Sequence, residues 1–468
     1  MKKLLCIILA LTAFFTLVSC KTIDKIAESM PLIDTDTKAE VESKHENEPQ
    51  IESEAEHKET LDTSDATETK PLLPSLTIKG SDISEYKIVY SSNSKNGSKE
   101  QAERLAEHIK SVLGKTVDIV ADPLSKIEKS IIISDTLPEE GGTLKIDTFT
   151  AVVQNIGSAV WISAINKHTL KAAIDKLIAD STPKTDSAQL DFNYSDDKAE
   201  TVVAEDLGEE LKVMTYNLKN GSPSTERKEN TINDIATYMP DTIGTQETHL
   251  KWINALTGSP LLSDYELVGE QRYGDEKPRT ANDNEASAIL YRKSKFNLID
   301  SGTYWLSETP EVVNSKLEES IYVRIMTYVV LERKSDGVKF VHVNTHLNST
   351  PEINLRQVQI MVDLVNEKIY SKHGKLPTFY TGDFNADPAS ENNDGYKYLI
   401  STGTENSRVV AEVTSNENTI KNGGMIDHCI VTKNDFLVTF FDVGQERPGE
   451  DRSNHYPVYV KMYITHQN

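Results

Sequence analysis

The C-terminal half of the sequence contains five apolar segments of strand length, each with polar residues at one end. In open α/β sheets, ligands collect where strands end, so we expect these polar side chains to converge on one cleft. The segments are LKVMTYN, DTIGTQE, FVHVNTH, TFYTGDFN and SNHYPVYV, and their polar residues are Asn217, Glu247, His346, Asp383 with Asn385, and Asn454 with His455.

These polar side chains are mainly oxygen donors, accompanied by two histidines. Carboxylate and amide oxygens suit a hard cation, and such a cation suits the chemistry of phosphate esters. The sequence contains no Cys/His cage of the kind that zinc prefers. We therefore expect Mg²⁺ or Mn²⁺ at this cleft.

The N-terminus has the pattern of a signal peptide. Lys2 and Lys3 precede an apolar run over residues 4–18, which is too short for a durable transmembrane helix. The ending Leu-Val-Ser-Cys resembles a bacterial lipobox, which predicts that Cys20 is lipidated and becomes the first residue of the mature protein. A plain secretory signal is the alternative. Cys6 lies in the signal peptide assigned to residues 1–20 and would be removed by cleavage before Cys20, which would carry the lipid. Only Cys429 would then remain unmodified, and we expect no intramolecular disulfide.

Residues 21–74 are rich in Glu, Thr, Ser, Asp and Lys, which predicts an acidic, disordered tether rather than a folded domain. The whole chain has a net charge of −23, and residues 209–468 contribute −10 from 37 acidic and 27 basic residues. Because nonspecific nucleic-acid binding depends on basic surface, this balance disfavours a tight binder of long DNA.

Residues 75–185 predict a small α/β accessory domain. Short apolar strands surround two amphipathic segments, 98–113 and 168–180, and Gly114 ends the first. The unit resembles the small non-catalytic domain that precedes the barrel in some exo-glycosidases, and we interpret it as an accessory module: a spacer, a cell-wall or glycan contact, or an interdomain partner. The polar residues 186–210 predict a linker.

From residue 211 to the end, seven motifs in order resemble the endonuclease/exonuclease/phosphatase superfamily. The resemblance implies a DNase I-like α/β fold for residues 211–468, in which two β-sheets pack face to face with helices outside. The motifs are VMTYNLKNG, GTQET, ASAILYRKSKF with GTYWLSETPE, VNTHLNS with NLRQVQ, TGDFNADP, MIDHCIV and SNHYPVYV.

The same resemblance implies a metal site at Glu247, Asn217 and Asn454. Glu247 would be a direct Mg²⁺ ligand, although an acid is also favoured at the start of the following helix. Asn217 would lie beside the metal or a phosphate oxygen, although a strand-end turn also favours asparagine. The family usually has aspartate where this chain has Asn454, so we expect weaker metal affinity.

The resemblance assigns catalytic roles to five further residues. Asp383 would orient the attacking water or accept its proton, while Asn385 would hold that water or the phosphate. His346 would donate to the phosphoryl group or the leaving oxygen. Asp427 would fix the tautomer of His455, which acts as the base or stabilises the transition state.

Together these features predict a lipid-anchored phosphoesterase on the extracytoplasmic face of the membrane, expected to be a monomer. The substrate stays open among nucleic acid, as for a nuclease, a lipid head group and a sugar phosphate. Arg324, Arg356 and the loop 271–285 could each contact it or be structural. The alternative from another class is a surface binding protein built on a weakened catalytic scaffold.

Overall fold

The computed structural model describes residues 75–122, 128–137, 145–182, 189–191, 200–421, 423–445 and 447–465. The expected signal peptide, Cys20 and the acidic tether lie outside these residues. Among the helices of the described ranges, none combines the length and the apolar character needed to cross a membrane.

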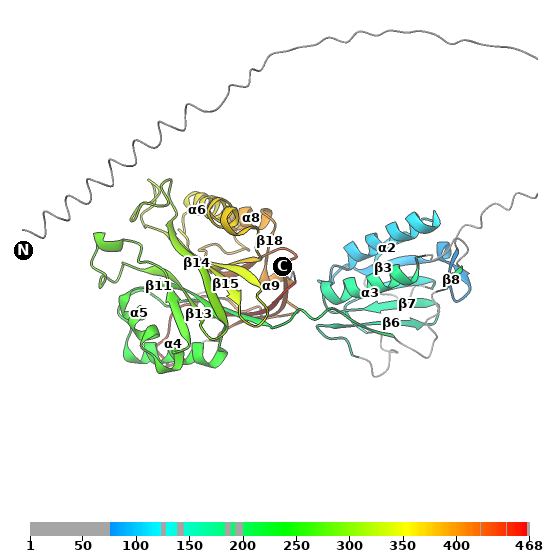
Figure 1. Ribbon diagram of the computed structural model, residues 1–468, viewed down its shortest axis with the longest axis horizontal. Coiled ribbons are helices and arrows are strands. Elements are labelled where there is room, and N and C mark those ends of the chain that lie inside the picture. The colour runs from blue at the N-terminus through cyan, green and yellow to red at the C-terminus, as the bar shows by residue number, and fades with distance from the viewer. Residues whose placement is uncertain are drawn as a thin grey trace, which may run out of the picture. The chain divides into compact units, whose positions relative to one another are not determined.

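A small α/β domain follows, built on a six-stranded sheet (Figure 1). Its strand order is β4-β3-β5-β7-β6-β9; the first four strands are parallel, and β6 is antiparallel to both of its neighbours, β7 and β9. The elements are β1 (Ser75–Ile78), β2 (Ser81–Asp82), η1 (Ile83–Glu85), β3 (Lys87–Ser91), α2 (Ser98–Leu113), β4 (Asp118–Asp122), β5 (Ser130–Ser134), β6 (Thr150–Ile156), β7 (Ala159–Ser163), α3 (Lys167–Asp180), β8 (Gln189–Asp191) and β9 (Glu200–Val203).

Both amphipathic segments of this domain form the expected helices. α2 buries Leu105 and Ile109, and α3 buries Ile174, in one apolar core with the sheet residues Ile88 and Ile133. Gly114 caps α2 in the left-handed region at φ 65°, where glycine carries no Cβ penalty. The helical period therefore predicted the correct buried faces.

The expectation of a linker over residues 186–210 is wrong in part. β8 pairs with β1 in a small three-stranded sheet, and β9 pairs with β6 at the edge of the main sheet. Both are short edge strands, which pair on one side only and often carry charged or polar side chains. The polar composition of residues 186–210 therefore gave no sign of strands β8 and β9.

The C-terminal residues form the two-sheet sandwich expected from the motifs. One sheet has the order β12-β13-β11-β10-β22-β21-β19 and the other β14-β15-β16-β17-β20-β18. The first sheet contains β10 (Leu211–Asn217), β11 (Thr242–Thr248), β12 (Tyr265–Val268), β13 (Ala286–Arg292), β19 (Val413–Thr414), β21 (Phe436–Val443) and β22 (Val458–Ile464). The second contains β14 (Phe296–Trp305), β15 (Ile325–Arg333), β16 (Lys339–His346), β17 (Thr378–Asp383), β18 (Thr404–Asn406) and β20 (Asp427–Thr432).

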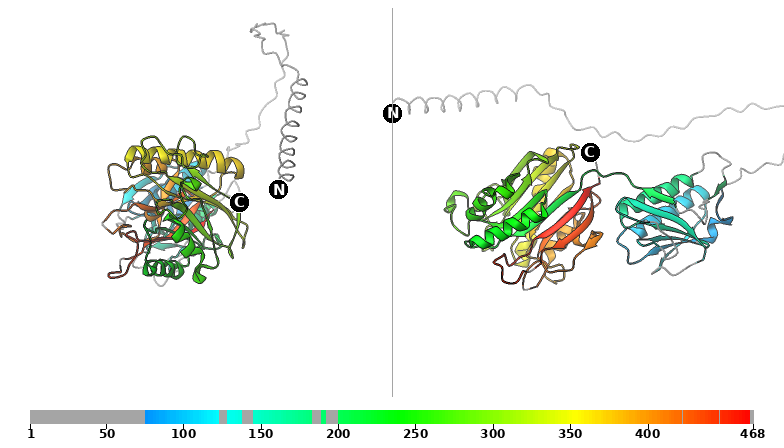
Figure 2. Two further views of the ribbon diagram at one scale, coloured as in Figure 1. Left: turned by 90° about the vertical axis from the view of Figure 1, so that its left-hand side faces the viewer. Right: turned by 90° about the horizontal axis from the view of Figure 1, so that it is seen from below.

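Helices cover the outer faces of both sheets (Figures 1 and 2). α4 and α5 pack on the first sheet, and α6 and α8 pack on the second. The helices are α4 (Thr225–Tyr238), α5 (Leu250–Thr257), η2 (Pro260–Leu262), η3 (Gly274–Glu276), α6 (Pro351–Leu364), η4 (Val365–Tyr370), α7 (Ser371–His373), α8 (Asp394–Ser401) and α9 (Ser407–Val410).

The central strands, such as β10 and β16, are buried on both faces, which explains their nearly continuous apolar character. On β10, Val213 points to the core between the sheets and Met214 to the core beneath α4 and α5. On β16, Phe340 lies between the sheets and Val341 lies under α6. This arrangement leaves the strand ends as the place where polar side chains can gather.

Candidate active site

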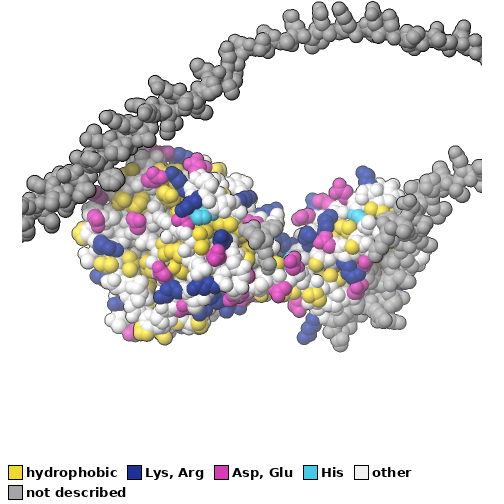
Figure 3. Space-filling model, in the orientation of Figure 1, with side chains coloured by type: hydrophobic (Ala, Val, Ile, Leu, Met, Phe, Trp, Pro, Cys, Tyr) yellow, Lys and Arg dark blue, Asp and Glu magenta, His cyan; other side chains and the backbone are white. Residues whose placement is uncertain are grey.

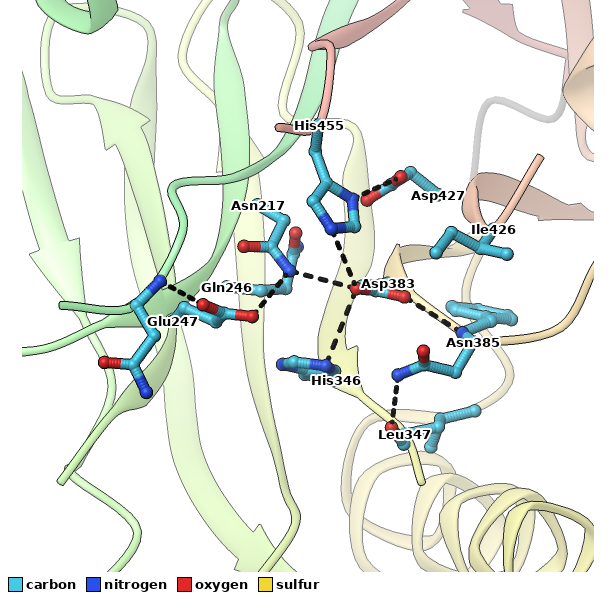
Figure 4. Close-up of polar contacts among 12 residues, drawn as sticks. Asn217, Gln246, Glu247, His346, Leu347, Asp383, Asn385, Ile426, Asp427 and His455 are labelled. Carbon is cyan, nitrogen blue, oxygen red and sulfur yellow. Dashed lines mark hydrogen bonds and ion pairs between the residues drawn. The ribbon is translucent and has the colours of Figure 1, made fainter. Parts of the chain in front are cut away.

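Strand register places three of the predicted residues side by side. β16 and β17 are parallel, with His346 opposite Asp383, and β17 and β20 are antiparallel, with Asp383 opposite Asp427. In the other sheet, Asn217 at the end of β10 lies opposite Gln246 of the parallel strand β11. The ends of the two sheets therefore form one polar cluster (Figure 4).

Glu247 and Asn385 hold unusual backbone conformations within this cluster. Their φ angles are 57° and 49°, in the left-handed region that non-glycine residues seldom adopt. The register between β11 and β13 also shifts between Thr245 and Thr248, an irregularity that re-aims side chains at a strand end. Such backbone strain costs on the order of 1–3 kcal/mol per residue and persists where the surrounding structure enforces it.

The amide of Asn217 lies between two carboxylates (Figure 4). Its Nδ2 donates to Asp383 Oδ2 at 2.9 Å and to Glu247 Oε1 at 3.2 Å. Its Oδ1 accepts from the backbone N–H of Lys219 at 3.0 Å. In this orientation Asn217 bridges the two acids, and it would have to turn its amide to present oxygen to a metal.

His455 and Asp427 form a buried pair. His455 Nδ1 lies 2.9 Å from Asp427 Oδ2, which leaves Nε2 facing Asp383 Oδ2 at 3.8 Å. Burial alone would lower the pKa of His455, but the charge and hydrogen bond of Asp427 outweigh it and raise that pKa to about 9. His455 is therefore an imidazolium at neutral pH in the metal-free protein.

The imidazole of His346, unlike that of His455, is neutral at neutral pH. Burial, together with the nearby charges of Arg324, Arg272 and His455, holds the pKa of His346 well below its usual range. Its Nε2 lies 3.5 Å from Asp383 Oδ2, and its buried Nδ1 has no hydrogen-bond partner among the described residues. A neutral imidazole here can donate one hydrogen bond to a ligand.

Asp383 is the centre of the cluster. Its Oδ2 faces Asn217 and both histidines, while its Oδ1 accepts from the backbone N–H of Asn385 at 3.0 Å. Burial, and next the charge of Asp427, raise the pKa of Asp383 above its usual range. Asn385 Nδ2 is itself held by the Leu347 carbonyl at 2.9 Å, which leaves its Oδ1 available.

The side chains of this cluster fit a hard cation. Asp383, Asp427 and His455 are buried, and one side-chain atom of each lies within 4.8 Å of the others. Because the His455 ring is protonated in the metal-free protein, the two carboxylates are the groups of this set that could bind a cation. Asp427 Oδ1 has no partner among the described residues, and Glu247 adds a further carboxylate across Asn217. Buried carboxylates that share so few donors are typical of sites completed by a divalent ion.

Asn454 immediately precedes His455 in the sequence, and its side chain is half-buried. Its backbone carbonyl accepts from the backbone N–H of Lys421, and within the described part of the chain its side chain makes no hydrogen bond to Glu247 or Asp383. Its role as a metal ligand stays a prediction.

The neighbouring Ser453 was not predicted from the sequence as a site residue. Its Oγ donates to the Asn217 carbonyl at 2.6 Å and accepts from the backbone N–H of His455 at 3.1 Å.

The basic residues divide into two kinds. Arg356 forms an exposed two-bond pair with Glu308, at 2.8 Å for each bond, so it is structural. Arg272 and Arg324 are buried in a cavity lined also by Glu247 and His346. Arg272 belongs to the loop 271–285, whose first residues are thus part of the site.

Glu285 also lies in that cavity and was not predicted as a site residue. It pairs with Arg272 at 2.9 Å, and it accepts from Asn220 Nδ2 at 2.5 Å. It stands just before β13, which is antiparallel to β11, so its end of β13 lies beside the end of β11. Knowledge of that strand pairing would have been needed to predict it.

Comparisons with known proteins give one family match. The model of the "Endonuclease/Exonuclease/phosphatase family" matches residues 214–450, just over half of the 468 residues. A comparison with curated proteins found no match.

Several solved structures are similar to part of the chain. An endonuclease/exonuclease/phosphatase from Bacteroides vulgatus is 25% identical, with a TM-score of 0.49, over 55% of this chain and 99% of that one. A mannosyl-6-phosphatase from Bacteroides thetaiotaomicron is 25% identical, with a TM-score of 0.46, over 54% of this chain and 100% of that one. The catalytic domain of human nocturnin is 19% identical, with a TM-score of 0.43, over 55% of this chain and 94% of that one.

Proposed function

The chain belongs to the endonuclease/exonuclease/phosphatase family, and on this premise we propose that it is a Mg²⁺- or Mn²⁺-dependent phosphoesterase. The observation that carries the proposal is the buried carboxylate of Asp383. Its Oδ2 accepts a hydrogen bond from Asn217 and faces the Nε2 atoms of His346 and His455. The reaction is attack of water on phosphorus in line with the leaving oxygen.

Asp383 is the group that accepts the proton of the attacking water. In the metal-free protein Asp427 raises the pKa of His455 to about 9, so the ring carries a proton that it can donate. Asp383 Oδ2 faces Asn217 and both histidines at the centre of the cluster, and in the metal-free protein burial raises the pKa of its carboxyl group. The new bond joins water oxygen to phosphorus, and the bond that breaks joins phosphorus to the ester oxygen.

The two histidines and Asn385 stabilise the charge that develops during this attack. The imidazolium of His455 is a charged donor and His346 is a neutral one, while the available Oδ1 of Asn385 can accept a hydrogen bond from the attacking water. His455 can also give its proton to the leaving oxygen, while Asp427 holds the ring in place at 2.9 Å.

Glu247 and Asp383, with Asn454 as a weaker neighbour, would hold the divalent cation. Bound there, the cation would neutralise charge on the phosphoryl oxygens of the substrate. Asn217 keeps Glu247 and Asp383 apart at defined positions through its two hydrogen bonds.

The same proposal places the enzyme on the extracytoplasmic face of the membrane, anchored through lipid at Cys20. It rests on the Leu-Val-Ser-Cys motif after the apolar run. On the face drawn in Figure 3, basic and acidic side chains are interspersed rather than gathered into a basic stripe. A basic stripe would favour binding of long nucleic acids. We therefore favour a lipid head group or a sugar phosphate over a long nucleic acid as the substrate.

Hydrolysis of bis-(p-nitrophenyl) phosphate and of p-nitrophenyl phosphate tests the proposal. We expect turnover by the purified chain that requires Mg²⁺ or Mn²⁺ and stops with a chelator. Asp383→Ala should lower kcat at least 1,000-fold, since it removes the base and a metal contact. Asp363→Ala, an exposed position on α6, is the matched control and should retain wild-type turnover.

Two results would contradict the proposal. One is equal turnover in the Asp383→Ala variant and the wild type, which would place the reaction elsewhere. The other is no turnover of either ester with any divalent cation. That second result would favour a surface binding protein on a weakened scaffold, with Asn454 as the first residue to examine.

A further inference from the structure

A loop beside the catalytic cavity exposes several large apolar side chains. The loop, residues 306–324, connects β14 to β15. Ile321 is 80% exposed and Tyr322 is 48% exposed. Val312 and Val313 of the same loop are exposed as well. Single exposed apolar residues are common on soluble proteins, whereas a group of them on one surface marks a binding site. We call Ile321, Tyr322 and Val313 the apolar rim.

The Tyr322 ring borders the catalytic cavity. Val323 and Arg324 follow Tyr322 in the chain, and both line this cavity together with His346. The centre of the Tyr322 ring lies 5.2 Å from Cζ of Arg324 and 5.9 Å from Cζ of Arg272, which also lines the cavity. Because His346 belongs to the reacting centre, a group attached to the substrate phosphate would lie against the Tyr322 ring where it leaves the cavity.

Hydrogen bonds fix the apolar rim relative to the catalytic strand β16. The buried Ser320 precedes Ile321, and its Oγ donates to the Tyr322 carbonyl at 2.6 Å. The same Oγ accepts from Asn348 Nδ2 at 3.1 Å. Asn348 comes two residues after His346, the last residue of β16. The rim is therefore held in place before a ligand binds, which lowers the entropy cost of binding.

A small core beneath the rim joins its loop to the loop 271–285. This core consists of Trp305, Val323 and Ile325. Tyr273 of the loop 271–285 packs against the core. The next residue, Gly274, lies against the rim, since a Cβ on Gly274 would be 2.6 Å from Val313 Cγ1. The two loops therefore pack together, and the rim is a surface of the folded domain.

We propose that the apolar rim binds the alcohol part of the substrate and that this alcohol is apolar, as in the phosphate ester of a lipid or of another long-chain alcohol. The inference rests on the proposed function and chooses between its two favoured substrate classes. A sugar has hydroxyl groups that need hydrogen-bond partners, and the side chains of Ile321 and Val313 offer none. A hydrocarbon chain would instead remove both side chains from water.

The affinity of the full chain for alkylphosphonates in Mg²⁺, measured by calorimetry, tests this inference. These compounds carry a phosphate-like group that is not hydrolysed. The wild type should bind octylphosphonate at least tenfold more tightly than ethylphosphonate, because each buried methylene should contribute about two- to fourfold. Binding of octylphosphonate should also have the more negative heat-capacity change, the mark of apolar burial. Ile321→Ser should weaken binding of octylphosphonate about fivefold more than binding of ethylphosphonate.

Hydrolysis shows the same preference and identifies the source of the alcohol. The wild type should have a higher kcat/KM for octyl phosphate than for ethyl phosphate or glucose 6-phosphate. Release of phosphate from phosphatidic acid in phosphatidylcholine vesicles would indicate a membrane lipid as the substrate. Release from octyl phosphate below its micelle concentration, without release from the vesicles, would indicate a dissolved ester.

Leu261→Ser is the matched control, because Leu261 is an exposed apolar residue of η2 and does not line the cavity. It should leave both phosphonate Kd values unchanged. Equal Kd values for the two phosphonates in the wild type would overturn the inference, as would a folded Ile321→Ser protein that keeps the wild-type preference. A wild-type dimer that Ile321→Ser separates without changing either Kd would also overturn it, since the rim would then be an interface between two copies.

The inference and the proposed function can fail separately. If the wild type hydrolyses neither p-nitrophenyl ester, the proposed function fails. The two phosphonate Kd values, and their change in Ile321→Ser, still decide whether the rim binds an apolar group. If the p-nitrophenyl esters are hydrolysed but octylphosphonate has no advantage over ethylphosphonate, the inference alone is wrong.

Discussion

At the scale of single residues, the ionisation of the site depends on Asp427. Its carboxylate touches His455 at 2.9 Å and, through its charge, also contributes to the raised pKa of Asp383. The charge of Asp427 thus favours the protonated form of the His455 ring and disfavours the ionised form of the Asp383 carboxyl group. Groups whose environments separate their pKa values in this way are typical of an acid and a base that work together.

The Asp427–His455 pair predicts a pH dependence of stability in the metal-free protein. The folded pKa of His455 is about 9, above its ordinary value of 6.5. The pair therefore contributes fully to the free energy of unfolding below pH 6.5, and this contribution is lost as pH rises through 9. We expect a loss of up to about 3 kcal/mol from this pair, since one pKa unit corresponds to about 1.4 kcal/mol.

Asp427→Asn should remove that part of the pH dependence. NMR of the His455 ring should show a pKa well below 9 in this variant, and urea unfolding at pH 6 and pH 9.5 should differ less than in the wild type. Asp363→Asn on the exposed face of α6 should behave as the wild type does. A His455 pKa near 9 in Asp427→Asn would refute the role of Asp427.

Asn454 carries a prediction about metal affinity. Asn454→Asp adds a negative charge at a position where the family usually has aspartate, so the Mg²⁺ concentration for half-maximal turnover should fall about tenfold. Asn233→Asp, on the exposed face of α4, controls for the added charge alone. Identical metal dependence in the wild type and Asn454→Asp would contradict a ligand role.

At the scale of elements, the two sheets meet through a polar layer beneath the site. Gln246 Nε2 donates to Asn344 Oδ1 at 2.8 Å, and the Asn344 amide donates back to the Thr245 carbonyl at 2.9 Å. His342 lies deeper in the same layer, between Thr242 and Thr381. Burial lowers the pKa of His342 to about 3, so it is a neutral structural residue and not a catalytic one.

Gly244 makes this close approach of the sheets possible. A Cβ at this position would lie 2.1 Å from Thr381 Oγ1 and 2.4 Å from Asn344 Oδ1. Gly244→Ala should therefore reduce the free energy of unfolding by about 1–3 kcal/mol, the usual cost of overpacking a core, and displace the ends of β11 and β16. Ser263→Ala on the exposed surface is the control. A Gly244→Ala protein as stable as the wild type would show that the sheets can move apart without cost.

The sequence predicted the strands and the polar residues at their ends, because strand-length apolar segments and ordered motifs are local properties. His346, Asp383 and Asp427 are neighbours as expected, since the alignment of β16, β17 and β20 brings their ends together. Glu285 and Ser453 escaped prediction because their importance arises from pairing between distant segments. The orientation of the Asn217 amide likewise depends on two carboxylates that come from other strands.

At the scale of the whole molecule, the proposal combines a catalytic sandwich with an anchor at the N-terminus. If Cys20 is lipidated, the wild-type chain produced in a bacterial host should incorporate labelled palmitate and sediment with membranes. Cys20→Ala should abolish the label, while Cys6→Ala, inside the signal peptide, should retain it. An unlabelled wild-type chain would favour the plain secretory signal instead.

The fate of the attacking oxygen tests the central claim most directly. Hydrolysis of p-nitrophenyl phosphate in ¹⁸O-labelled water with Mg²⁺ should place one ¹⁸O atom per turnover in the released phosphate. The reason is that the water beside Asp383 attacks phosphorus and the bond from phosphorus to the leaving oxygen breaks. Label in the released p-nitrophenol, or equal label incorporation by the Asp383→Ala variant, would contradict the account.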